Sequence, residues 1–209
     1  MIYVKINFRT RLLTNLTQHL QSVTLKERET QNGHQSAVLW FAGLSASGKS
    51  TIAMATQREL FKRGIQITVL DGDNVRHGLN AGLGFSEADR IENLRRVAEA
   101  SKLFAETGFI VLTSFISPLR KNREVARKIV EPMNFFKIYI KVTIDTAENR
   151  DPKGLYKMAR AGEIKDFTGI DSPFEEPDHA DLIIENDSRT VEECVEQIIA
   201  FLQEKQIIS

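Results

Sequence analysis

The stretch FAGLSASGKSTIA, residues 41–53, follows the apolar run AVLW and decides the fold of this chain. It contains the pattern G-x-x-x-x-G-K-[ST], which begins at Gly43 and ends at Ser50. The run before it predicts a buried strand, and the residues after it predict a helix. A loop between such elements is typical of a phosphate-binding loop, in which backbone N–H groups and a helix N-terminus surround an anion. A chance glycine turn is the alternative, but the flanking elements favour a nucleotide-binding loop.

Each position of this loop has an expected role. Gly43 leaves the strand, residues 44–47 curl so that their N–H groups point inward, and Gly48 lets the backbone approach an anion. Lys49 reaches the outer phosphates, and the hydroxyl of Ser50 is offered to Mg²⁺. The candidate nucleotide-binding residues of the loop are Gly43, Leu44, Ser45, Ala46, Ser47, Gly48, Lys49, Ser50 and Thr51.

The composition indicates one globular domain without a polyanionic partner. With 209 residues, of which 42% are apolar, the chain can bury a substantial core. The 28 basic and 28 acidic residues give a formal net charge of zero, so neither nucleic acid nor an anionic membrane is an expected partner. One cysteine fits a reducing compartment, and no apolar run reaches the roughly 18 residues of a membrane span. We expect a cytoplasmic protein.

Residues 1–36 are expected to form an N-terminal arm ahead of one α/β domain at residues 37–209. The apolar residues Ile2, Val4, Ile6 and Phe8 alternate with more polar ones, which predicts a strand with one buried face. Such an arm can pack on the domain or on a second subunit, and we expect a homodimer. The alternative is an organelle transit peptide, which the first 26 residues faintly resemble because they include no acidic residue.

Strand and helix signals alternate through the rest of the chain. Near-continuous apolar runs separated by helices are typical of a parallel sheet that is covered on both faces. We therefore expect a doubly wound α/β fold with five parallel strands, and we expect Cys194, on the apolar face of the last helix, to lie in the core. The expected strands are residues 37–42, 66–71, 109–115, 135–142 and 180–186, and the expected helices follow Lys49, span 87–107 and 119–130, and begin after Thr190.

Residues 149–179 interrupt this alternation between the fourth and fifth strands. They contain three prolines, three glycines and mixed charges, with one short helical stretch at residues 155–161. A segment of this length at the carboxyl ends of strands, beside a phosphate loop, is typical of a lid that closes over bound phosphates and excludes water. A floppy insertion is the alternative.

Two carboxylates follow the second strand in LDGDNVRHGLN, residues 70–80. We expect this strand to neighbour the phosphate loop, so that Asp71 and Asp73 lie beside the γ-phosphate. Asp71 would hold Mg²⁺ through water, and Asp73 would orient an attacking hydroxyl and accept its proton. The third strand, FIVLTSF, ends without the acidic residue that usually holds magnesium in such folds, which supports this assignment. A solvated Asp-Gly turn is the alternative.

Basic residues on both sides of a predicted helix start suit an anionic acceptor. Arg76 precedes this helix, and Phe85 lies just before its first turn. Arg90, Asn93 and Arg96 are three residues apart and share one helix face. Such a face can grip an anion while an aromatic ring stacks on a base, although a salt-bridged surface helix explains the same residues equally well.

Five blocks in order resemble the adenylylsulfate kinase family, which phosphorylates adenosine 5′-phosphosulfate (adenylylsulfate) on its 3′-hydroxyl. They are GLSASGKST, DGDNVRHGLN, LGFSEADRIENLRR, FISP and RDPKGLYKMARAGEIKDFTGIDSPFEEP, from about residue 37 to residue 177. Ordered blocks are far more specific than the phosphate loop alone. The resemblance implies a P-loop kinase that uses ATP and Mg²⁺ to make 3′-phosphoadenylylsulfate in sulfate assimilation.

The resemblance also implies an acceptor site and a residue that contacts ATP. Phe85 and Phe167 would sandwich the adenine of adenylylsulfate, and the arginines would hold its phosphosulfate. Arg150, at the start of the lid, would contact the adenine of ATP. The implied adenylylsulfate-binding residues are Asp73, Arg76, Phe85, Arg90, Asn93, Ile116, Ser117, Lys153 and Phe167, and the candidate catalytic residues are Lys49, Asp73 and Ser117.

Ser117 and Ala46 need separate comment. Ser117, in FISP, matches a serine that is phosphorylated in some family members. Direct transfer to a held hydroxyl needs no covalent relay, so we expect Ser117 only to line the site. Ala46 stands where the family usually has glycine, which restricts the turn slightly.

Two other functions stay open on these residues. A non-catalytic domain that binds 3′-phosphoadenylylsulfate for regulation would lose the phosphate loop, whereas this chain keeps Lys49 and Ser50. Another small-molecule kinase with the same Asp-x-Asp spacing, such as a gluconate or shikimate kinase, is the second alternative. The paired aromatic residues and the FTGIDSPFEEP segment argue against it.

Overall fold

In a computed structural model, which describes residues 21–209, the chain forms one five-stranded sheet in the order β2-β3-β1-β4-β5. The strands are β1 (Ala37–Ala42), β2 (Ile67–Asp71), β3 (Ile110–Ser114), β4 (Asn134–Lys141) and β5 (Leu182–Glu185). Every neighbouring pair is parallel. The predicted doubly wound α/β fold is confirmed, and the predicted strand ends lie close to the observed ones.

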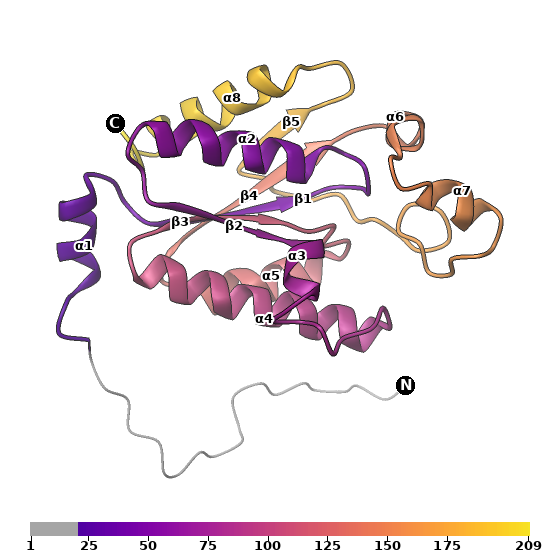
Figure 1. Cartoon of the computed structure of the whole chain (residues 1–209), viewed down its shortest axis with the longest axis horizontal. Coiled ribbons are helices and arrows are strands. Elements are labelled where there is room, and N and C mark those ends of the chain that lie inside the picture. Colours follow the sequence, from indigo (N-terminus) through magenta and orange to yellow (C-terminus); the bar gives the residue numbers. More distant parts are fainter. Residues whose placement is uncertain (1–20) are drawn as a thin grey trace, which may run out of the picture.

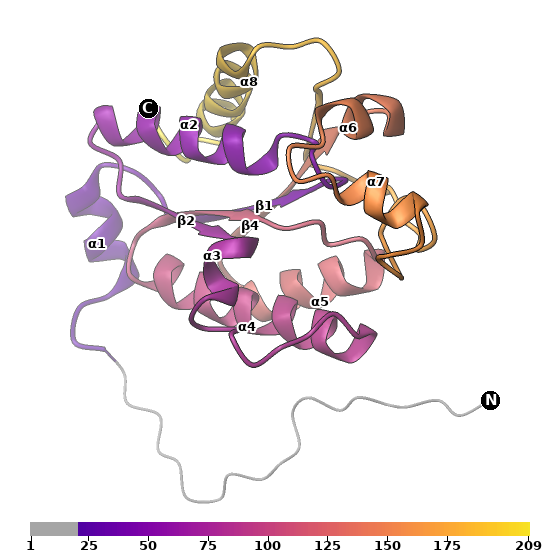
Figure 2. The same ribbon diagram turned by 45° about the vertical axis from the view of Figure 1, so that its right-hand side comes forward.

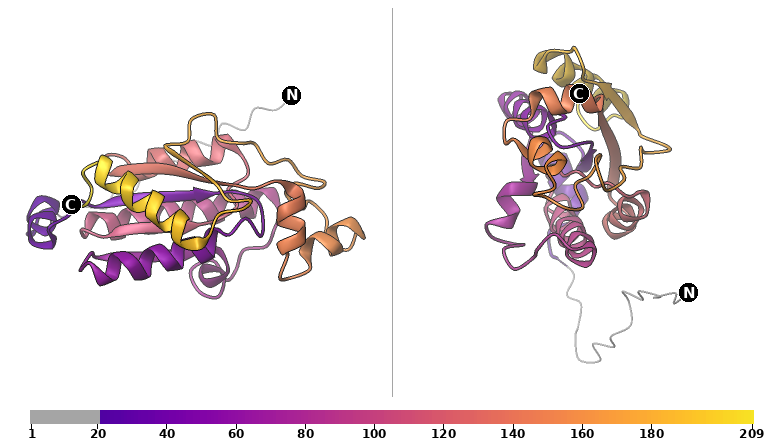
Figure 3. Two further views of the ribbon diagram at one scale, coloured as in Figure 1. Left: turned by 90° about the horizontal axis from the view of Figure 1, so that it is seen from above. Right: turned by 90° about the vertical axis from the view of Figure 1, so that its right-hand side faces the viewer.

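Helices cover both faces of the sheet (Figure 1). They are α1 (Leu25–Asn32), α2 (Lys49–Lys62), α3 (Gly72–Arg76), α4 (Glu87–Glu106), α5 (Arg120–Val130), α6 (Ile144–Arg150), α7 (Leu155–Arg160) and α8 (Val191–Glu204). The helices α2 and α8 lie on one face, and α4 and α5 lie on the other (Figure 2). Seen from above, α1 and the lid helices α6 and α7 lie at opposite ends of the sheet (Figure 3).

The central strand β1 is buried on both sides, which explains its unbroken apolar run. Leu39 and Phe41 belong to the core layer under α2 and α8, whereas Val38 and Trp40 belong to the layer under α4 and α5. Successive side chains of a strand point to opposite faces, so both layers need apolar residues from β1. Cys194 is fully buried in the first layer, as predicted.

The strand order places the phosphate loop at the centre of the sheet. β1 lies between β3 and β4, with Phe41 opposite Ser114 and Ala42 opposite Tyr139. The expectation that β2 neighbours the phosphate loop holds at the end of the strand only, because β3 lies between β1 and β2 in the sheet. The sequence does not indicate how many strand positions the connection after β1 spans. Asp71, at the end of β2, nevertheless hydrogen-bonds to the first turn of α2 across β3.

The described part of the N-terminal arm is attached to the domain. Ser36 N donates a hydrogen bond to Glu29 Oε1 of α1 at 2.9 Å. The predicted strand at residues 2–9 lies outside the described residues. Within residues 21–209, no helix combines the length and the apolar character needed to cross a membrane.

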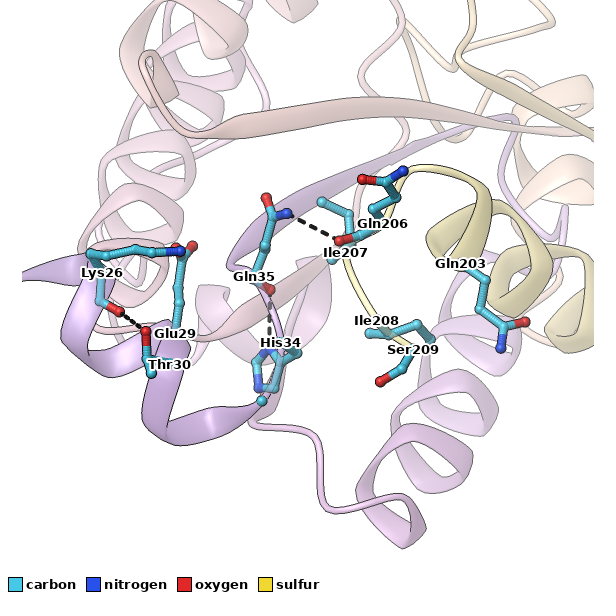
Figure 4. A pocket seen from close by; sticks show the side chains of 11 residues that line it. Lys26, Glu29, Thr30, His34, Gln35, Gln203, Gln206, Ile207, Ile208 and Ser209 are labelled. Carbon is cyan, nitrogen blue, oxygen red and sulfur yellow. Dashed lines mark hydrogen bonds between the residues drawn. The ribbon is translucent and has the colours of Figure 1, made fainter.

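A cavity of about 430 Å³ lies between α1 and the end of α8 (Figure 4). His34 forms part of its wall and is fixed on both sides. Its Nδ1 is 2.9 Å from Gln35 O, and its Nε2 is 3.1 Å from Gln66 N, which donates to it. Because α1 is at the opposite end of the sheet from the lid helices, this cavity is separate from the phosphate loop (Figures 1 and 2).

Candidate active site

The phosphate loop forms a tight turn that leaves no space for a side chain at its two glycines. A Cβ on Gly43 would lie 2.5 Å from Ile140 O and 2.8 Å from Ser47 Oγ. A Cβ on Gly48, where φ is 96°, would lie 2.7 Å from Asn186 Nδ2. Both glycines are therefore required by close packing beneath the loop.

The other loop residues complete the turn into α2. Ala46 has a φ of 57°, a left-handed conformation that costs a residue with a Cβ about 1–2 kcal/mol. This strain explains why glycine suits the position. Gly43 N donates to Ile116 O at 3.4 Å, which joins the loop to the segment after β3. Thr51 lies in the first turn of α2, and its side chain is exposed.

Lys49 is folded back onto the loop. Its Nζ donates to Leu44 O at 2.6 Å and to Ser47 Oγ at 3.3 Å. Burial lowers the pKa of the ammonium group to about 7, and the nearby Asp71 carboxylate acts in the opposite direction. Bound phosphates would favour the charged form of this lysine. The arrangement therefore suits a lysine that transfers from the loop oxygens to phosphate oxygens.

Ser50, Asp71 and Ser114 form a polar cluster beside the loop. Ser50 Oγ donates to Asp71 Oδ2 at 2.6 Å and lies 3.0 Å from Ser114 Oγ. Asp71 is held from its other oxygen, since Oδ1 accepts from Asp73 N at 3.0 Å. No group of three or more His, Cys, Asp or Glu side chains among residues 21–209 is placed to hold a metal ion. One carboxylate and one hydroxyl fit Mg²⁺, which commonly takes its remaining ligands from water and substrate phosphates.

Asp73 projects from α3 and meets the lid. Its Oδ2 forms an ion pair with Lys153 Nζ. The Asp73 side chain is 69% exposed and that of Lys153 is 57% exposed, so both groups stay accessible to a ligand. The structure thus brings together two residues that the sequence assigns to the acceptor site.

Two arginines cluster around Phe85. The Arg76 guanidinium lies 4.3 Å from the centre of the Phe85 ring and donates to Leu83 O at 3.1 Å. Arg90 donates from Nε to Phe85 O at 2.8 Å and from Nη2 to Asp166 O of the lid at 3.0 Å. Burial first, and then the charge of Arg90, lower the pKa of Arg76. The hydrogen-bond partners of both guanidinium groups are carbonyl oxygens, and the carboxylates of Asp73 and Asp89 only partly offset the lowering of the Arg76 pKa, which favours an anionic ligand.

Asn93 and Arg96 occupy different environments despite their shared spacing. Asn93 is buried, and its Oδ1 accepts a hydrogen bond from Asn80 Nδ2 at 2.9 Å. Arg96 pairs with Glu92 at 2.8 Å on the surface of α4. Arg96 therefore fits the surface ion-pair alternative, and anion binding by Arg90 and Asn93 stays a prediction.

Ser117, in the segment that follows β3, is buried. Its Oγ accepts a hydrogen bond from Trp40 Nε1 at 2.9 Å, and its backbone is left-handed, with a φ of 45°. The buried Arg123 donates to Ser117 O at 2.5 Å and to Glu175 O at 2.6 Å. Arg123 therefore joins the segment around Ser117 to the end of the lid. Nothing in the local sequence indicates the contacts that Trp40 and Arg123 make with Ser117.

The lid has a small apolar core that packs on the phosphate loop. Phe167 is buried with Leu44 of the loop and packs edge-on against Tyr156, with ring centres 5.0 Å apart. Phe85 is exposed and faces Arg76. In this structure the two phenylalanines thus contact protein groups, and sandwiching of an adenine by them stays a prediction.

Two residues near the end of β5 support the loop side of the site. Arg150 Nη2 donates to Asp187 O at 3.0 Å, which fixes the end of α6 beside the segment after β5. Asn186 is buried, and its Nδ2 donates to Ser47 O at 2.8 Å. Asn186 was not predicted to belong to the site, because nothing in its local sequence indicates a contact with the phosphate loop, which is distant along the chain.

The sequence was compared with family models and with individual proteins. The family model described as adenylylsulphate kinase matches residues 35–185. The adenylyl-sulfate kinase of Staphylococcus carnosus is 53% identical over 194 residues, which cover 93% of this chain and 98% of that protein. The probable adenylyl-sulfate kinase of Bacillus subtilis is 52% identical over 191 residues, 91% of this chain and 97% of that protein.

A comparison of structures gives the same family. The APS (adenylylsulfate) kinase of Mycobacterium tuberculosis, solved in complex with AMPPNP and APS, superposes with a TM-score of 0.79 at 48% identity. The match covers 81% of this chain and 99% of that one. The similarity therefore extends over the sheet, the phosphate loop and the greater part of the chain.

Proposed function

The chain belongs to the adenylylsulfate kinase family, and from this premise we infer that it uses ATP to phosphorylate adenylylsulfate. The products are 3′-phosphoadenylylsulfate and ADP. The observation that carries this function is the position of the lid between two sites. The same lid packs Phe167 on Leu44 of the phosphate loop and pairs Lys153 with Asp73 at the acceptor side. A donor and an acceptor can thus be enclosed together.

On the donor side, the phosphate loop binds and orients ATP. N–H groups of the loop and of the first turn of α2 surround the phosphates, and Lys49 neutralises charge on the transferred phosphoryl group. Ser50 and Asp71 would hold Mg²⁺, which supplies positive charge between the phosphates when it is bound. Arg150 is our candidate for contact with the adenine of ATP.

On the acceptor side, Asp73 places the 3′-hydroxyl and accepts its proton as the new bond forms. The phosphosulfate would lie near Arg76 and Arg90, whose guanidinium groups donate to carbonyl oxygens. Phe85, Asn93, Ile116, Ser117, Lys153 and Phe167 complete the proposed acceptor site. The phosphoryl group passes directly to the hydroxyl, because a lysine, a metal site and an acceptor carboxylate already supply the parts of an in-line displacement.

The setting of the enzyme is also a proposal. The single cysteine, buried and without a disulfide, suits a reducing compartment, so we place the protein in the cytoplasm. We propose a homodimer with the N-terminal arm of residues 1–36 at its interface. Sedimentation of the full chain and of a chain that begins at residue 21 tests this assembly.

The alternatives are separated by an acceptor assay. ADP release is measured with ATP, Mg²⁺ and one acceptor at a time, namely adenylylsulfate, gluconate or shikimate. We expect release with adenylylsulfate alone. Release with a sugar acid or shikimate instead would indicate another small-molecule kinase. Tight binding of 3′-phosphoadenylylsulfate without any ADP release would indicate the regulatory alternative.

A further inference from the structure

Three carbonyl oxygens of the phosphate loop are held by side chains. Leu44 O accepts from Lys49 Nζ within the loop segment itself. The other two donors come from distant elements. Ser45 O accepts from the hydroxyl of Tyr156, in α7 of the lid, at 3.1 Å, and Ser47 O accepts from Nδ2 of Asn186, just after β5, at 2.8 Å.

These two bonds fix the direction of the N–H groups that face a nucleotide. A trans peptide is planar, and its C=O and N–H point to opposite sides. When the Ser45 carbonyl points toward Tyr156, the N–H of Ala46 points away from the lid. Within the described part of the chain, neither the Ala46 N–H nor the Gly48 N–H has a hydrogen-bond partner. Such free N–H groups are the ones that a phosphate loop offers to an anion.

The surroundings of Tyr156 favour its hydrogen bond to Ser45 O. Its ring is fully buried and packs against Phe167. Burial, with a smaller contribution from Asp151, raises the pKa of its hydroxyl to about 12, so the proton is retained at any physiological pH. Its backbone N donates to Asp151 Oδ2 at 2.8 Å, which fixes the start of α7.

The lid that carries Tyr156 also contacts the acceptor side. Lys153 lies three residues before it and pairs with Asp73. Asp166, later in the lid, accepts from Arg90 through its carbonyl oxygen. A lid docked on the acceptor site therefore also places the Tyr156 hydroxyl on the phosphate loop.

We propose that Tyr156 is a positioning residue that couples the two sites, because its hydroxyl aligns the Ser45–Ala46 peptide with the nucleotide phosphates when the lid is docked. Adenylylsulfate, by holding the lid, then tightens nucleotide binding. This inference rests on the proposed function for the identity of the acceptor. Asn186 makes the equivalent bond from the body of the domain, so its effect on nucleotide binding is independent of the lid.

The test is titration calorimetry of AMPPNP with Mg²⁺, without and with saturating adenylylsulfate. In the wild type we expect AMPPNP to bind more tightly when adenylylsulfate is present. In Tyr156→Phe, which removes one hydroxyl, we expect this gain to be about fivefold smaller, the equivalent of one neutral hydrogen bond. In Asn186→Ala the affinity should fall by a similar factor in both titrations, with the gain intact.

Two controls make the outcome decisive. Ser101→Ala removes a buried hydroxyl that donates to Val97 O within α4, away from the lid and the phosphate loop, and should leave the gain unchanged. Melting temperatures of all variants show that each is folded. An equal gain in the wild type and Tyr156→Phe, or no gain in the wild type, would overturn the inference. Wild-type turnover of adenylylsulfate is measured in parallel, and its absence would overturn the proposed function instead.

Discussion

Lys153 of the lid and Asp73 of α3, 80 residues apart in the sequence, form an ion pair at the acceptor side of the site. Both side chains are more than half exposed. Ion pairs of this kind contribute about 1 kcal/mol or less, so an incoming acceptor can separate them at little cost. The pair thus holds the lid near Asp73 and still leaves the carboxylate available to a hydroxyl.

Asp73→Asn tests the role of this carboxylate. The amide keeps the shape of the side chain but cannot accept a proton, so we expect turnover to fall by about a hundredfold or more. AMPPNP affinity should change far less, because Asp73 does not contact the phosphate loop through its side chain. Steady-state rates and calorimetry of the same protein give both values. Equal losses in turnover and nucleotide affinity would point to a binding role alone.

Lys49→Ala tests the donor side. A positioned positive charge on the transferring phosphoryl group contributes about 3 kcal/mol or more, so turnover should fall at least about a hundredfold. The fold should persist, because the lysine bonds only to oxygens of its own loop segment. Circular dichroism checks the fold, and single-turnover rates check the loss. Near-normal turnover by the folded variant would refute the assigned role.

The lowered pKa of Lys49 predicts proton uptake on nucleotide binding. With a pKa of about 7, the amine is largely neutral at pH 8 in the free protein. Bound phosphates favour the ammonium form, so binding of AMPPNP at pH 8 should take up nearly one proton, and affinity should fall as the pH rises above 7. Calorimetry in two buffers of different ionisation enthalpy measures the uptake. Lys49→Ala is the control, and uptake equal to that of the variant would contradict the prediction.

Arg90→Ala should separate the two ligands. The lost charge-assisted hydrogen bond to the acceptor is worth about 1.5–3 kcal/mol, so adenylylsulfate should bind roughly tenfold to a hundredfold more weakly. ATP binding should be spared. Arg96→Ala is the matched control, since Arg96 lies on the same helix and pairs with Glu92. If Arg90→Ala binds adenylylsulfate as well as this control does, Arg90 is only a surface residue.

Ser117→Ala distinguishes direct transfer from a covalent relay. The Ser117 hydroxyl is buried and occupied by the Trp40 Nε1–H, so its removal should cost about one hydrogen bond, near 1 kcal/mol, and leave a substantial part of the activity. Rapid-quench kinetics of the variant and mass spectrometry of the wild type after exposure to ATP measure this. Complete inactivity of the folded variant, with kinetically competent phosphoserine in the wild type, would establish the relay.

The sequence predicts the elements of this fold well where burial or capping is local. The unbroken apolar run of β1 and the Thr190–Glu193 capping box of α8 both encode their own structure. The short helices α3 (GDNVR) and α6 (IDTAENR) were not predicted, because they contain residues of low helix propensity, whereas the equally short α7 (LYKMAR) is rich in helix formers and was predicted. The sequence does not predict the place of β2 in the sheet, since strand order depends on packing between elements and not on the strand itself.

The residues of the site likewise include some that the local sequence predicts and some that it does not. The phosphate loop is contiguous in sequence, so its glycines and Lys49 can be assigned from spacing alone. Tyr156 and Asn186, by contrast, reach the loop from positions 111 residues after Ser45 and 139 residues after Ser47. Only the packing of the lid and the alignment of β5 bring these donors to the loop carbonyls. Residue patterns suggested Asp73, Arg76, Phe85, Arg90 and Asn93 but left a surface helix equally possible, and the other acceptor residues were assigned only through the family resemblance. These others are Ile116, Ser117, Lys153 and Phe167.

The most direct test of the central claim is product analysis after the protein is mixed with ATP, Mg²⁺ and adenylylsulfate. Ion-pair chromatography with mass spectrometry separates the nucleotides, and ³¹P NMR locates the added phosphate. The account predicts 3′-phosphoadenylylsulfate and ADP in equal amounts, with at least about a hundredfold less product from Lys49→Ala over the same time. ADP without phosphorylated adenylylsulfate, or phosphate at a position other than the 3′-hydroxyl, would contradict it.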